Sequence, residues 1–361
     1  MTFAEARPEP SSTFVSLSGE LWIGTYAGGG GAGLYPLSME AGRLVIGAAD
    51  AVARNASFGV YSSRFDTQYL ADEQDDGALG VYRRASDGWR MLASSSSGGA
   101  APCHVALDRT QSCIAIANYG SGTTALYRLD AAGLPILPAD IHKAVGQGPD
   151  RERQTSPHAH WVGFGLDNRC LYVADLGADV VRAFAVDVEL GTLGTPRIAF
   201  VAPPGSGPRH MLFTAAHPGT AYLICELSST LMILDVDGAD LHTRATLSTL
   251  PEGWQGSTIV AHIDTNAAGD RLYVSNRGHD SIAVFALDPN GDATLVQHVA
   301  SGGASPRFFT IFDDGRRMIV AYERDHRVTI LDVRPDGTLA PTDLAVTVPG
   351  AAFAFISRRL C

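Results

Sequence analysis

Short apolar strands recur along this chain in pairs separated by tight turns. In each copy a small or proline-flanked position leads one apolar strand, a turn follows, and a second apolar strand ends in a polar residue. The pattern occurs seven times, and its leading positions lie 44–56 residues apart: Phe58, His104, His160, His210, His262, Phe308 and Ala352. A period of this length made of short strands predicts an all-β fold, a β-propeller in which each repeat forms one four-stranded blade.

The copy that begins at His160 illustrates the four strands of one blade. An inner strand HWVGFGLD precedes the second strand CLYVADLG, the third strand VVRAFAVD and the outer strand RIAFVAP. Alternation with a period of two is typical of strands that bury one face against a neighbouring sheet. A pair of β-sandwiches or a β-solenoid is the alternative, but sandwiches lack a sustained period and solenoid coils are much shorter.

The two ends of the chain complete the count of seven blades. AAFAFISRR at 351–359 is an inner strand with nothing after it, whereas LWIGTYAG (21–28), AGLYPLSM (32–39) and LVIGAADAV (44–52) lack an inner strand. One C-terminal strand and three N-terminal strands are therefore expected to form the last blade and close the ring. We expect a single propeller domain over residues 1–361, with 1–18 as an N-terminal extension.

Two columns of polar residues are expected to meet at one mouth of the central channel. The inner strands line that channel, and the second strands end close to where the inner strands begin. The inner column supplies His104, His160, His210 and His262, with Arg209 and Arg307 in the sequences PRH and PRF. The second-strand ends supply Asp72, Asn118, Asp175, Glu226, Asn276 and Tyr322, and Arg277 follows Asn276.

These residue types suit the opening or closing of an anionic lactone. Arginine binds a carboxylate or phosphate through a bidentate fork and can polarise an ester carbonyl. His160 or Glu226 would activate water, and the same group would then protonate the leaving alkoxide. The alternative interpretation is structural: Asp72, Asn118 and Asn276 could tie adjacent blades through backbone hydrogen bonds, and the arginines could form salt bridges between blades.

Composition narrows the class of protein. The net charge is −11 and no basic stripe is visible, so nucleic acid is not an expected partner. No apolar run approaches the roughly 20 residues that span a bilayer, and the start of the chain lacks a secretory pattern, so no membrane is expected as a partner. The cysteines Cys103, Cys113, Cys170, Cys225 and Cys361 have no CxxC spacing, which favours reduced thiols in a cytoplasmic protein. The sequence leaves the oligomeric state open.

Four segments resemble the seven-bladed β-propeller lactonases: PHAHWVGFGLDNRCLYVADLG, GPRHMLFTAAHPGTAYLICELSST, HIDTNAAGDRLYVSNRGHDSIAVF and SPRFFTIFDDGRRMIVAYE. That family includes a propeller type of 6-phosphogluconolactonase and a fungal 3-carboxy-cis,cis-muconate lactonizing enzyme. The resemblance extends from residue 24 to the last strand. It implies catalytic roles for His160, Arg209, Glu226 and Arg277, with no metal or other cofactor required. The expected function is hydrolysis of a small anionic sugar lactone, with 6-phosphogluconolactone as the default substrate.

Substrate binding is assigned to a second set of residues at the same mouth: His104, His210, His262, Arg307 and Asp175. The loop 147–157 could cover this mouth, and its Arg151 and Arg153 could add positive charge for an anionic substrate; a solvated loop is the alternative.

One position departs from the family pattern. Where the family usually has an acid before the SNR repeat, this chain has His262 in VAHID. His262 completes the run of four histidines, and neutral imidazoles of His104, His160, His210 and His262 around one axis could bind a divalent metal such as zinc. Three alternatives therefore stay open: a metal-dependent enzyme, a muconate-type lactonizing cycloisomerase, and a non-enzymatic propeller that serves as a binding platform.

Overall fold

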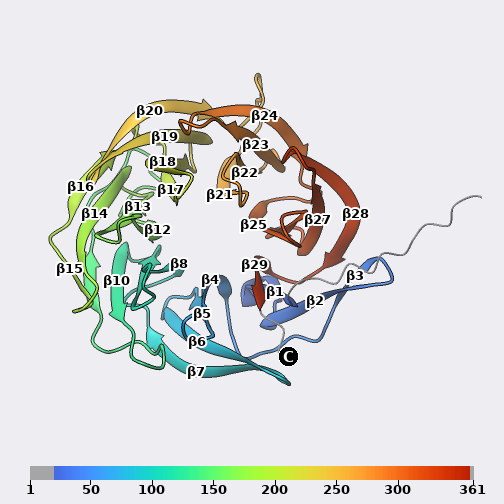
Figure 1. The fold of residues 1–361 in the computed structure, drawn as a ribbon, viewed down its shortest axis with the longest axis horizontal. Helices are drawn as coiled ribbons and strands as arrows, with labels where there is room; N and C mark the ends of the chain where they lie inside the picture. The colour runs from blue at the N-terminus through green and yellow to red at the C-terminus, as the bar shows by residue number, and fades with distance from the viewer. Residues whose placement is uncertain (1–19, 358–361) are drawn as a thin grey trace, which may run out of the picture.

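Seven antiparallel β-sheets surround a central axis in the computed structural model, which describes residues 20–357 (Figure 1). Apart from strands, these residues contain one short 3-10 helix, η1 (Ala27–Gly29). No helix within them has the length and apolarity to cross a membrane. The extension expected at 1–18 lies outside the described residues.

Six blades follow one another in chain order. The first blade consists of β4 (Ala56–Ser62), β5 (Thr67–Asp72), β6 (Ala78–Ala85) and β7 (Gly88–Ser96). The second consists of β8 (Pro102–Leu107), β9 (Cys113–Asn118), β10 (Thr123–Arg128) and β11 (Asp140–Lys143). The third consists of β12 (Ala159–Phe164), β13 (Cys170–Asp175), β14 (Val180–Asp187), β15 (Thr192–Leu193) and β16 (Arg197–Val201). The fourth blade consists of β17 (Pro208–Thr214), β18 (His217–Cys225), β19 (Thr230–Asp237) and β20 (Asp240–Ser248). The fifth consists of β21 (Ile259–Thr265), β22 (Arg271–Arg277), β23 (Ser281–Leu287) and β24 (Ala293–Ala300). The sixth consists of β25 (Pro306–Phe312), β26 (Arg317–Tyr322), β27 (Arg327–Val333) and β28 (Leu339–Thr347). In the third of these blades the outer strand is split, because β15 and β16 both pair with β14.

The seventh blade joins the two ends of the described chain. Its strand order is β29 (Ala351–Ser357), β1 (Glu20–Thr25), β2 (Leu34–Glu40) and β3 (Arg43–Ile46). β1 and β29 are antiparallel neighbours from Glu20↔Ser357 to Thr25↔Ala351. The predicted seven-bladed propeller, closed by one C-terminal and three N-terminal strands, is confirmed. The ring is therefore held shut by main-chain hydrogen bonds.

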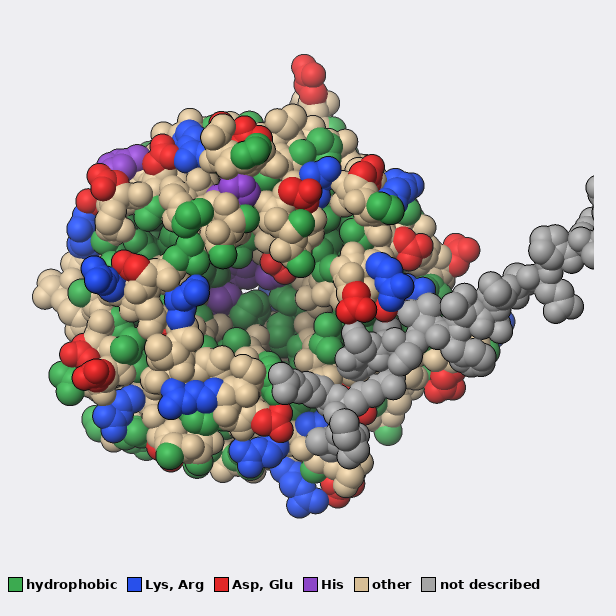
Figure 2. All heavy atoms as spheres, in the orientation of Figure 1, with side chains coloured by type: hydrophobic (Ala, Val, Ile, Leu, Met, Phe, Trp, Pro, Cys, Tyr) green, Lys and Arg blue, Asp and Glu red, His purple; other side chains and the backbone are tan. Residues whose placement is uncertain are grey.

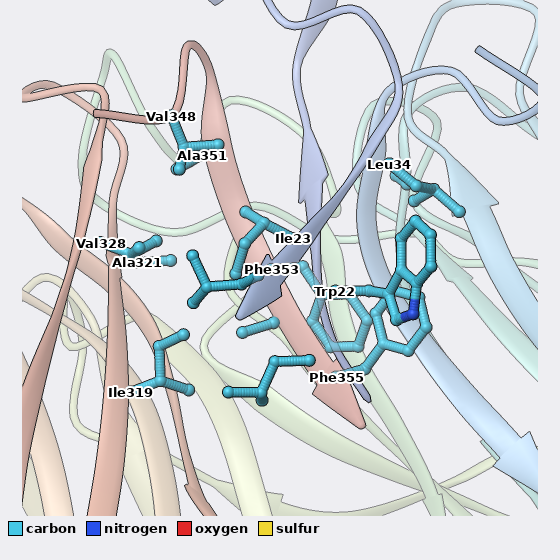
Figure 3. Packing of buried hydrophobic residues seen from close by; sticks show 14 of the residues in the cluster. Trp22, Ile23, Leu34, Ile319, Ala321, Val328, Val348, Ala351, Phe353 and Phe355 are labelled. Atoms are coloured by element: carbon cyan, nitrogen blue, oxygen red, sulfur yellow. The ribbon is translucent and has the colours of Figure 1, made fainter. Parts of the chain in front are cut away.

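Apolar side chains fill the spaces between blades. Around the closing blade, Trp22, Ile23 and Phe353 are at most 4% exposed. They share one cluster with Ile319 and Val328 of the preceding blade (Figure 3). Each blade therefore buries its two faces against its neighbours, which is why the strands read as nearly continuous apolar runs.

A repeated tyrosine ties each of four blades to the next one. The hydroxyls of these tyrosines donate to glycine carbonyls at 2.6–3.3 Å, in the pairs Tyr69–Gly133, Tyr172–Gly238, Tyr222–Gly291 and Tyr273–Gly337. The four glycines have φ between +60° and +84°, where a side chain would be strained. Each tyrosine stands three residues before an equivalent position of its second strand that pairs with the start of the inner strand, so it marks the register of that second strand. These positions are Asp72, Asp175, Cys225 and Asn276.

Replacing Ile23 by alanine tests the closing blade. Ile23 is fully buried, so Ile23→Ala should lower the free energy of unfolding by about 2–5 kcal/mol through lost burial and a residual cavity. Urea unfolding measures this change. The control Val201→Ala removes a side chain that is 69% exposed and should change stability by less than about 0.5 kcal/mol. A loss as small as the control's would mean that the closing blade is not part of the cooperative unit.

Candidate active site

Every inner strand begins with an irregularity in its pairing to the second strand. In β8, for example, Pro102 pairs with Asn118 and His104 with Ala117, so Cys103 has no partner. Register shifts at the equivalent point give each of the seven inner strands one extra residue. These residues are termed the bulge column: Ser57, Cys103, His160, Arg209, Ala261, Arg307 and Ala352. A bulge re-aims a side chain and is common beside active sites. Most of the bulge column lines one small cavity on the axis.

The sequence alignment is wrong by one residue at His160. It groups His160 with His104 and His210, but Trp161 pairs with Ala174 as His104 pairs with Ala117. His160 therefore belongs to the bulge column beside Arg209, and Trp161 is the true equivalent of His104. The alignment is also wrong by one residue at Ala352. Phe353 pairs with Gly24 of the second strand, so Phe353 is the equivalent of His104 and Ala352 belongs to the bulge column.

A second column lies at the ends of the second strands. It contains Tyr26, Glu73, Tyr119, Leu176, Glu226, Arg277 and Glu323, termed the rim column. The backbone N–H of six of them donates to the carbonyl of the residue just before an inner strand, at 2.6–3.2 Å. Arg277 instead pairs with Ile259 at the start of β21. Seven blades thus bring seven side chains to one mouth of the channel.

Glu226 belongs to this rim column, one position beyond the register expected from sequence. The alignment groups it with Asn118, but Cys225 pairs with Pro208 and Thr230 as Asn118 pairs with Pro102 and Thr123. Tyr222 is the signal that could have revealed this register, because it precedes Cys225 by three residues as Tyr172 precedes Asp175.

Glu226 is the buried centre of the mouth, with 1% of its side chain exposed. Its carboxylate accepts hydrogen bonds from Arg209 and, at 2.7 Å, from Nη2 of Arg153. Nη2 of Arg277 lies 3.3 Å and Nε2 of His160 3.8 Å from Oε2. Burial alone would raise the pKa of Glu226, but the guanidinium groups outweigh burial and hold it well below its usual range. The structure thus brings together the four residues named as catalytic from sequence, although their roles stay predictions.

His160 is held in one tautomer beside this carboxylate. Its Nε2 accepts a hydrogen bond from Nη1 of Arg209 at 2.6 Å, and arginine can only donate. The proton of the neutral ring is therefore on Nδ1, which lies 3.7 Å from Sγ of Cys103. Burial, followed by the charge of Arg209, keeps the pKa of His160 well below its ordinary value. The imidazole is uncharged at neutral pH.

The two buried arginines differ in the donors that they leave unused. Arg209 donates from Nε to the carbonyl of Ala261 at 2.6 Å and from Nη1 to His160 and Glu226. Nε and Nη2 of Arg277 are buried and make no hydrogen bond within residues 20–357, although Nη2 is within ion-pair distance of Glu226. Burial and the nearby Arg209 lower the pKa of Arg277 to about 10. Because buried donors without a hydrogen bond are costly, Arg277 is better placed than Arg209 to bind an oxygen of a ligand.

Two rim carboxylates were missed by the sequence analysis. Arg307 lies 3.5 Å from Glu73 and 3.8 Å from Glu323, and Nη1 of Arg277 lies 3.6 Å from Glu323. The hydroxyl of Tyr26 donates to Glu73 at 2.7 Å. Reading one position beyond each second-strand end would have found both carboxylates. They alternate with the arginines, so the mouth is a ring of paired charges.

Arg153 reaches this ring from the loop 147–157. Its Nη2 contacts Glu226 and also donates to the hydroxyl of Tyr119 at 3.2 Å. The side chain of Arg153 is 36% exposed, against 4% for Arg209, whereas Arg151 in the same loop is exposed. Arg153 is therefore the outermost cation of the mouth.

The residues at the second-strand ends hold the blades together. Asn118 and Asn276 each donate from Nδ2 to a backbone carbonyl, of Ser97 and Thr249, at 2.9 Å. Asp175, assigned to substrate binding from sequence, accepts from the backbone N–H groups of His158 and Ala178 and pairs with Arg182 at 3.2 Å. These contacts occupy the carboxylate of Asp175 within its own blade, and its substrate-binding role stays a prediction. Asn118 and Asn276 have the tying role considered for them.

The remaining histidines form a plug across the channel. The plug consists of Phe58, His104, Trp161, His210, His262, Phe308 and Phe353, one side chain per blade. Phe58 stacks on His104 at 4.0 Å, and Nδ1 of His210 lies 3.3 Å from Nδ1 of His262. His104 and His262 line a cavity on the far side of the plug from His160, and His210 borders both cavities.

The substrate-binding role expected for His104 and His262 therefore does not fit the arginine mouth. Among residues 20–357, no group of three or more His, Cys, Asp and Glu side chains has the arrangement of a metal site. The ring of His160 lies 5.4 Å from that of His210, as near as the rings of His104 at 5.2 Å and His262 at 5.5 Å, but the bulge turns His160 to the arginine side of the plug.

Comparison with known proteins agrees with this architecture. The family described as "Lactonase, 7-bladed beta-propeller" matches residues 20–355. A 6-phosphogluconolactonase of Bacillus subtilis (strain 168) is 29% identical over 344 residues, which cover 91% of this chain and 96% of the relative. The solved structure of a periplasmic gluconolactonase of Pseudomonas aeruginosa superposes with a TM-score of 0.86 at 26% identity, covering 95% of this chain and 100% of that one. The solved structure of a putative 6-phosphogluconolactonase of Bacteroides fragilis NCTC 9343 superposes with a TM-score of 0.83 at 27% identity, covering 96% of this chain and 99% of that one.

Replacing Glu226 by glutamine tests the electrostatic centre. Glu226→Gln leaves buried guanidinium groups without their shared anion, so we expect the free energy of unfolding at pH 7 to fall by about 3–5 kcal/mol. The folded-state pKa of Glu226 is depressed, so its contribution is complete above the unfolded-state pKa of about 4.3 and is lost progressively as the pH falls from there through the folded-state pKa. Urea unfolding should therefore show a smaller difference between wild type and variant at pH 3 than at pH 7.

Glu323→Gln is the control for this variant, since Glu323 contacts the same Arg277 but is 38% exposed. It should cost less than about 1 kcal/mol. An equal difference between wild type and Glu226→Gln at both pH values would contradict the proposed ionised state.

Proposed function

We propose that this chain, which belongs to the seven-bladed β-propeller lactonase family, hydrolyses a sugar lactone, with 6-phosphogluconolactone as the substrate. The observation that carries the proposal is the buried cluster in which two donors of Arg277 make no hydrogen bond beside a neutral His160 and an ionised Glu226. Relatives named 6-phosphogluconolactonase and gluconolactonase support the same reaction class.

Ring opening begins with attack of water on the lactone carbonyl. The bulge column encloses a cavity large enough for about one water molecule, bordered by His160, Arg209 and Arg307. We place the attacking water there and the carbonyl oxygen at Nε and Nη2 of Arg277. As the carbonyl becomes an oxyanion, the guanidinium stabilises the developing charge in a site that is largely closed to solvent.

His160 carries the proton through the reaction. Nε2 takes a proton from water in exchange for the hydrogen bond that it accepts from Arg209. Glu226, 3.8 Å from Nε2, then stabilises the imidazolium. When the ring C–O bond breaks, Nε2 returns the proton to the leaving alkoxide, and the new carboxylic acid ionises in water. Arginine supplies the positive charge in these steps, so we propose that no metal ion is needed.

The charge of the mouth favours an anionic substrate. Arg153, Arg209, Arg277 and Arg307 face Glu73, Glu226 and Glu323. The excess of one positive charge attracts an anion without leaving a large uncompensated charge when the site is empty of substrate. Arg153, at the outer edge, is the cation that we assign to the phosphate of the substrate.

The first test is the rate of 6-phosphogluconolactone hydrolysis, corrected for spontaneous opening. His160→Ala and Arg277→Ala should each lower kcat by about 100-fold or more, because one removes the proton carrier and the other the oxyanion donor. His242→Ala, an exposed histidine in β20, should keep full activity. EDTA should leave the wild-type rate unchanged. Full activity in either site variant, or loss of activity with EDTA, would contradict this mechanism.

A second test separates the phosphate from the lactone ring. Arg153→Ala should raise KM for 6-phosphogluconolactone about tenfold or more, since a charge-assisted bidentate contact is lost. Its KM for unphosphorylated gluconolactone should change little. Arg151→Ala, in the same loop but exposed, should leave both values near wild type. Equal effects of Arg153→Ala on the two substrates would show that Arg153 does not bind the phosphate.

A further inference from the structure

The channel contains a second cavity, on the far side of the plug from the arginines. Its volume is about 370 Å³. Its walls include the residues two positions beyond the plug on four inner strands: Leu212, Asp264, Thr310 and Phe355. Residues two apart on a strand share a face, so these side chains form the next layer along the axis. Figure 2 shows a hollow at the centre of the ring, in which hydrophobic and histidine side chains gather.

Asp264 is the only carboxylate in the lining of this cavity. The lining contains no lysine or arginine, and within residues 20–357 no cation acts on the Asp264 carboxyl. The hydrogen bond made to its side chain comes from the backbone N–H of Thr265 at 2.8 Å. Asp264 is partly buried. A partly buried carboxylate without a nearby cation can gain from a positively charged partner.

The rest of the lining offers aromatic faces and hydrogen-bond acceptors. Phe58, Trp161, Phe308, Phe353 and Phe355 all line the cavity. Gln68 also lines it, is 1% exposed, and has an Oε1 atom with no hydrogen-bond partner among the described residues. A carboxylate and an amide oxygen accept hydrogen bonds, and aromatic faces attract cations. The complementary ligand donates hydrogen bonds, is positively charged and has an apolar body.

We propose that this cavity is a second ligand site, which binds a small organic cation with a protonated primary amine. The ammonium group contacts Asp264, the apolar body lies against the aromatic rings, and Oε1 of Gln68 is a further hydrogen-bond acceptor in the wall. The site does not depend on the proposed lactonase function, since the plug separates the cavity from His160 and Glu226.

The pH dependence of this binding follows from the groups that face the cavity. Burial raises the pKa of Asp264 to about 6. Burial lowers the pKa of His262 to about 3 and holds those of His104 and His210 well below their ordinary value. The histidines therefore stay neutral between pH 5 and 8, while Asp264 loses its charge as the pH falls through about 6. Affinity for the cation should decline over that range.

Benzylamine is a suitable probe, because it is protonated at pH 8 and carries one aromatic ring. Isothermal titration calorimetry of the full chain at pH 8 should show saturable binding to one site. Benzyl alcohol, its neutral counterpart, should bind at least about tenfold more weakly, as expected when the charge contributes 1.4 kcal/mol or more. Asp264→Asn should weaken benzylamine binding by a similar factor, and so should lowering the pH to 5.

Asp237→Asn removes an exposed carboxylate at the end of β19 and should leave binding unchanged. A thermal melt checks that Asp264→Asn is folded, and its lactone hydrolysis rate should match wild type because Asp264 lies outside the arginine mouth. The proposal is overturned if wild type shows no saturable binding, if benzyl alcohol binds as tightly as benzylamine, or if Asp264→Asn keeps its affinity. Phe355→Leu provides a second variant without a charge change, and unaltered affinity there would exclude the aromatic contact.

Discussion

The irregularity at the start of each inner strand is the constraint from which the candidate site follows. An unbroken strand would send successive side chains alternately into the channel and into the blade interface. The extra residue turns His160, Arg209 and Arg307 toward one mouth, while the next residue in each strand blocks the channel. The chemistry of the mouth and the separation of the two cavities both depend on this one feature of backbone pairing.

Sequence patterns predicted the architecture well because it rests on apolar periodicity. Seven strand pairs, their spacing and the joined ends of the chain all follow from short apolar runs that recur at a regular spacing. The membership of the bulge and rim columns was harder to predict, since a shift of one residue along a strand moves a side chain to another face. His160 and Glu226 were both placed one position from their true registers, although the chemical reasoning about them did not depend on that placement.

Other parts of the site could not be read from repeats at all. Arg153 meets Glu226 across 73 residues of sequence from a loop without a counterpart in the other blades. Asp175 looks chemically like Glu226, but backbone N–H groups and Arg182 occupy its carboxylate. Packing between blades decides which carboxylate meets free cations. The sequence of a single strand therefore does not reveal it.

The paired charges of the mouth also bear on how a turnover ends. Opening a lactone replaces an uncharged ester by a carboxylate, so the product has one more negative charge than the substrate. Arg277 would hold that product more tightly than the substrate if nothing competed for it. Glu226 and Glu323 lie 3.3 and 3.6 Å from its guanidinium, and in the proposed mechanism they would compete with the product for the arginine. The carboxylates that hold the mouth together would thereby favour product release.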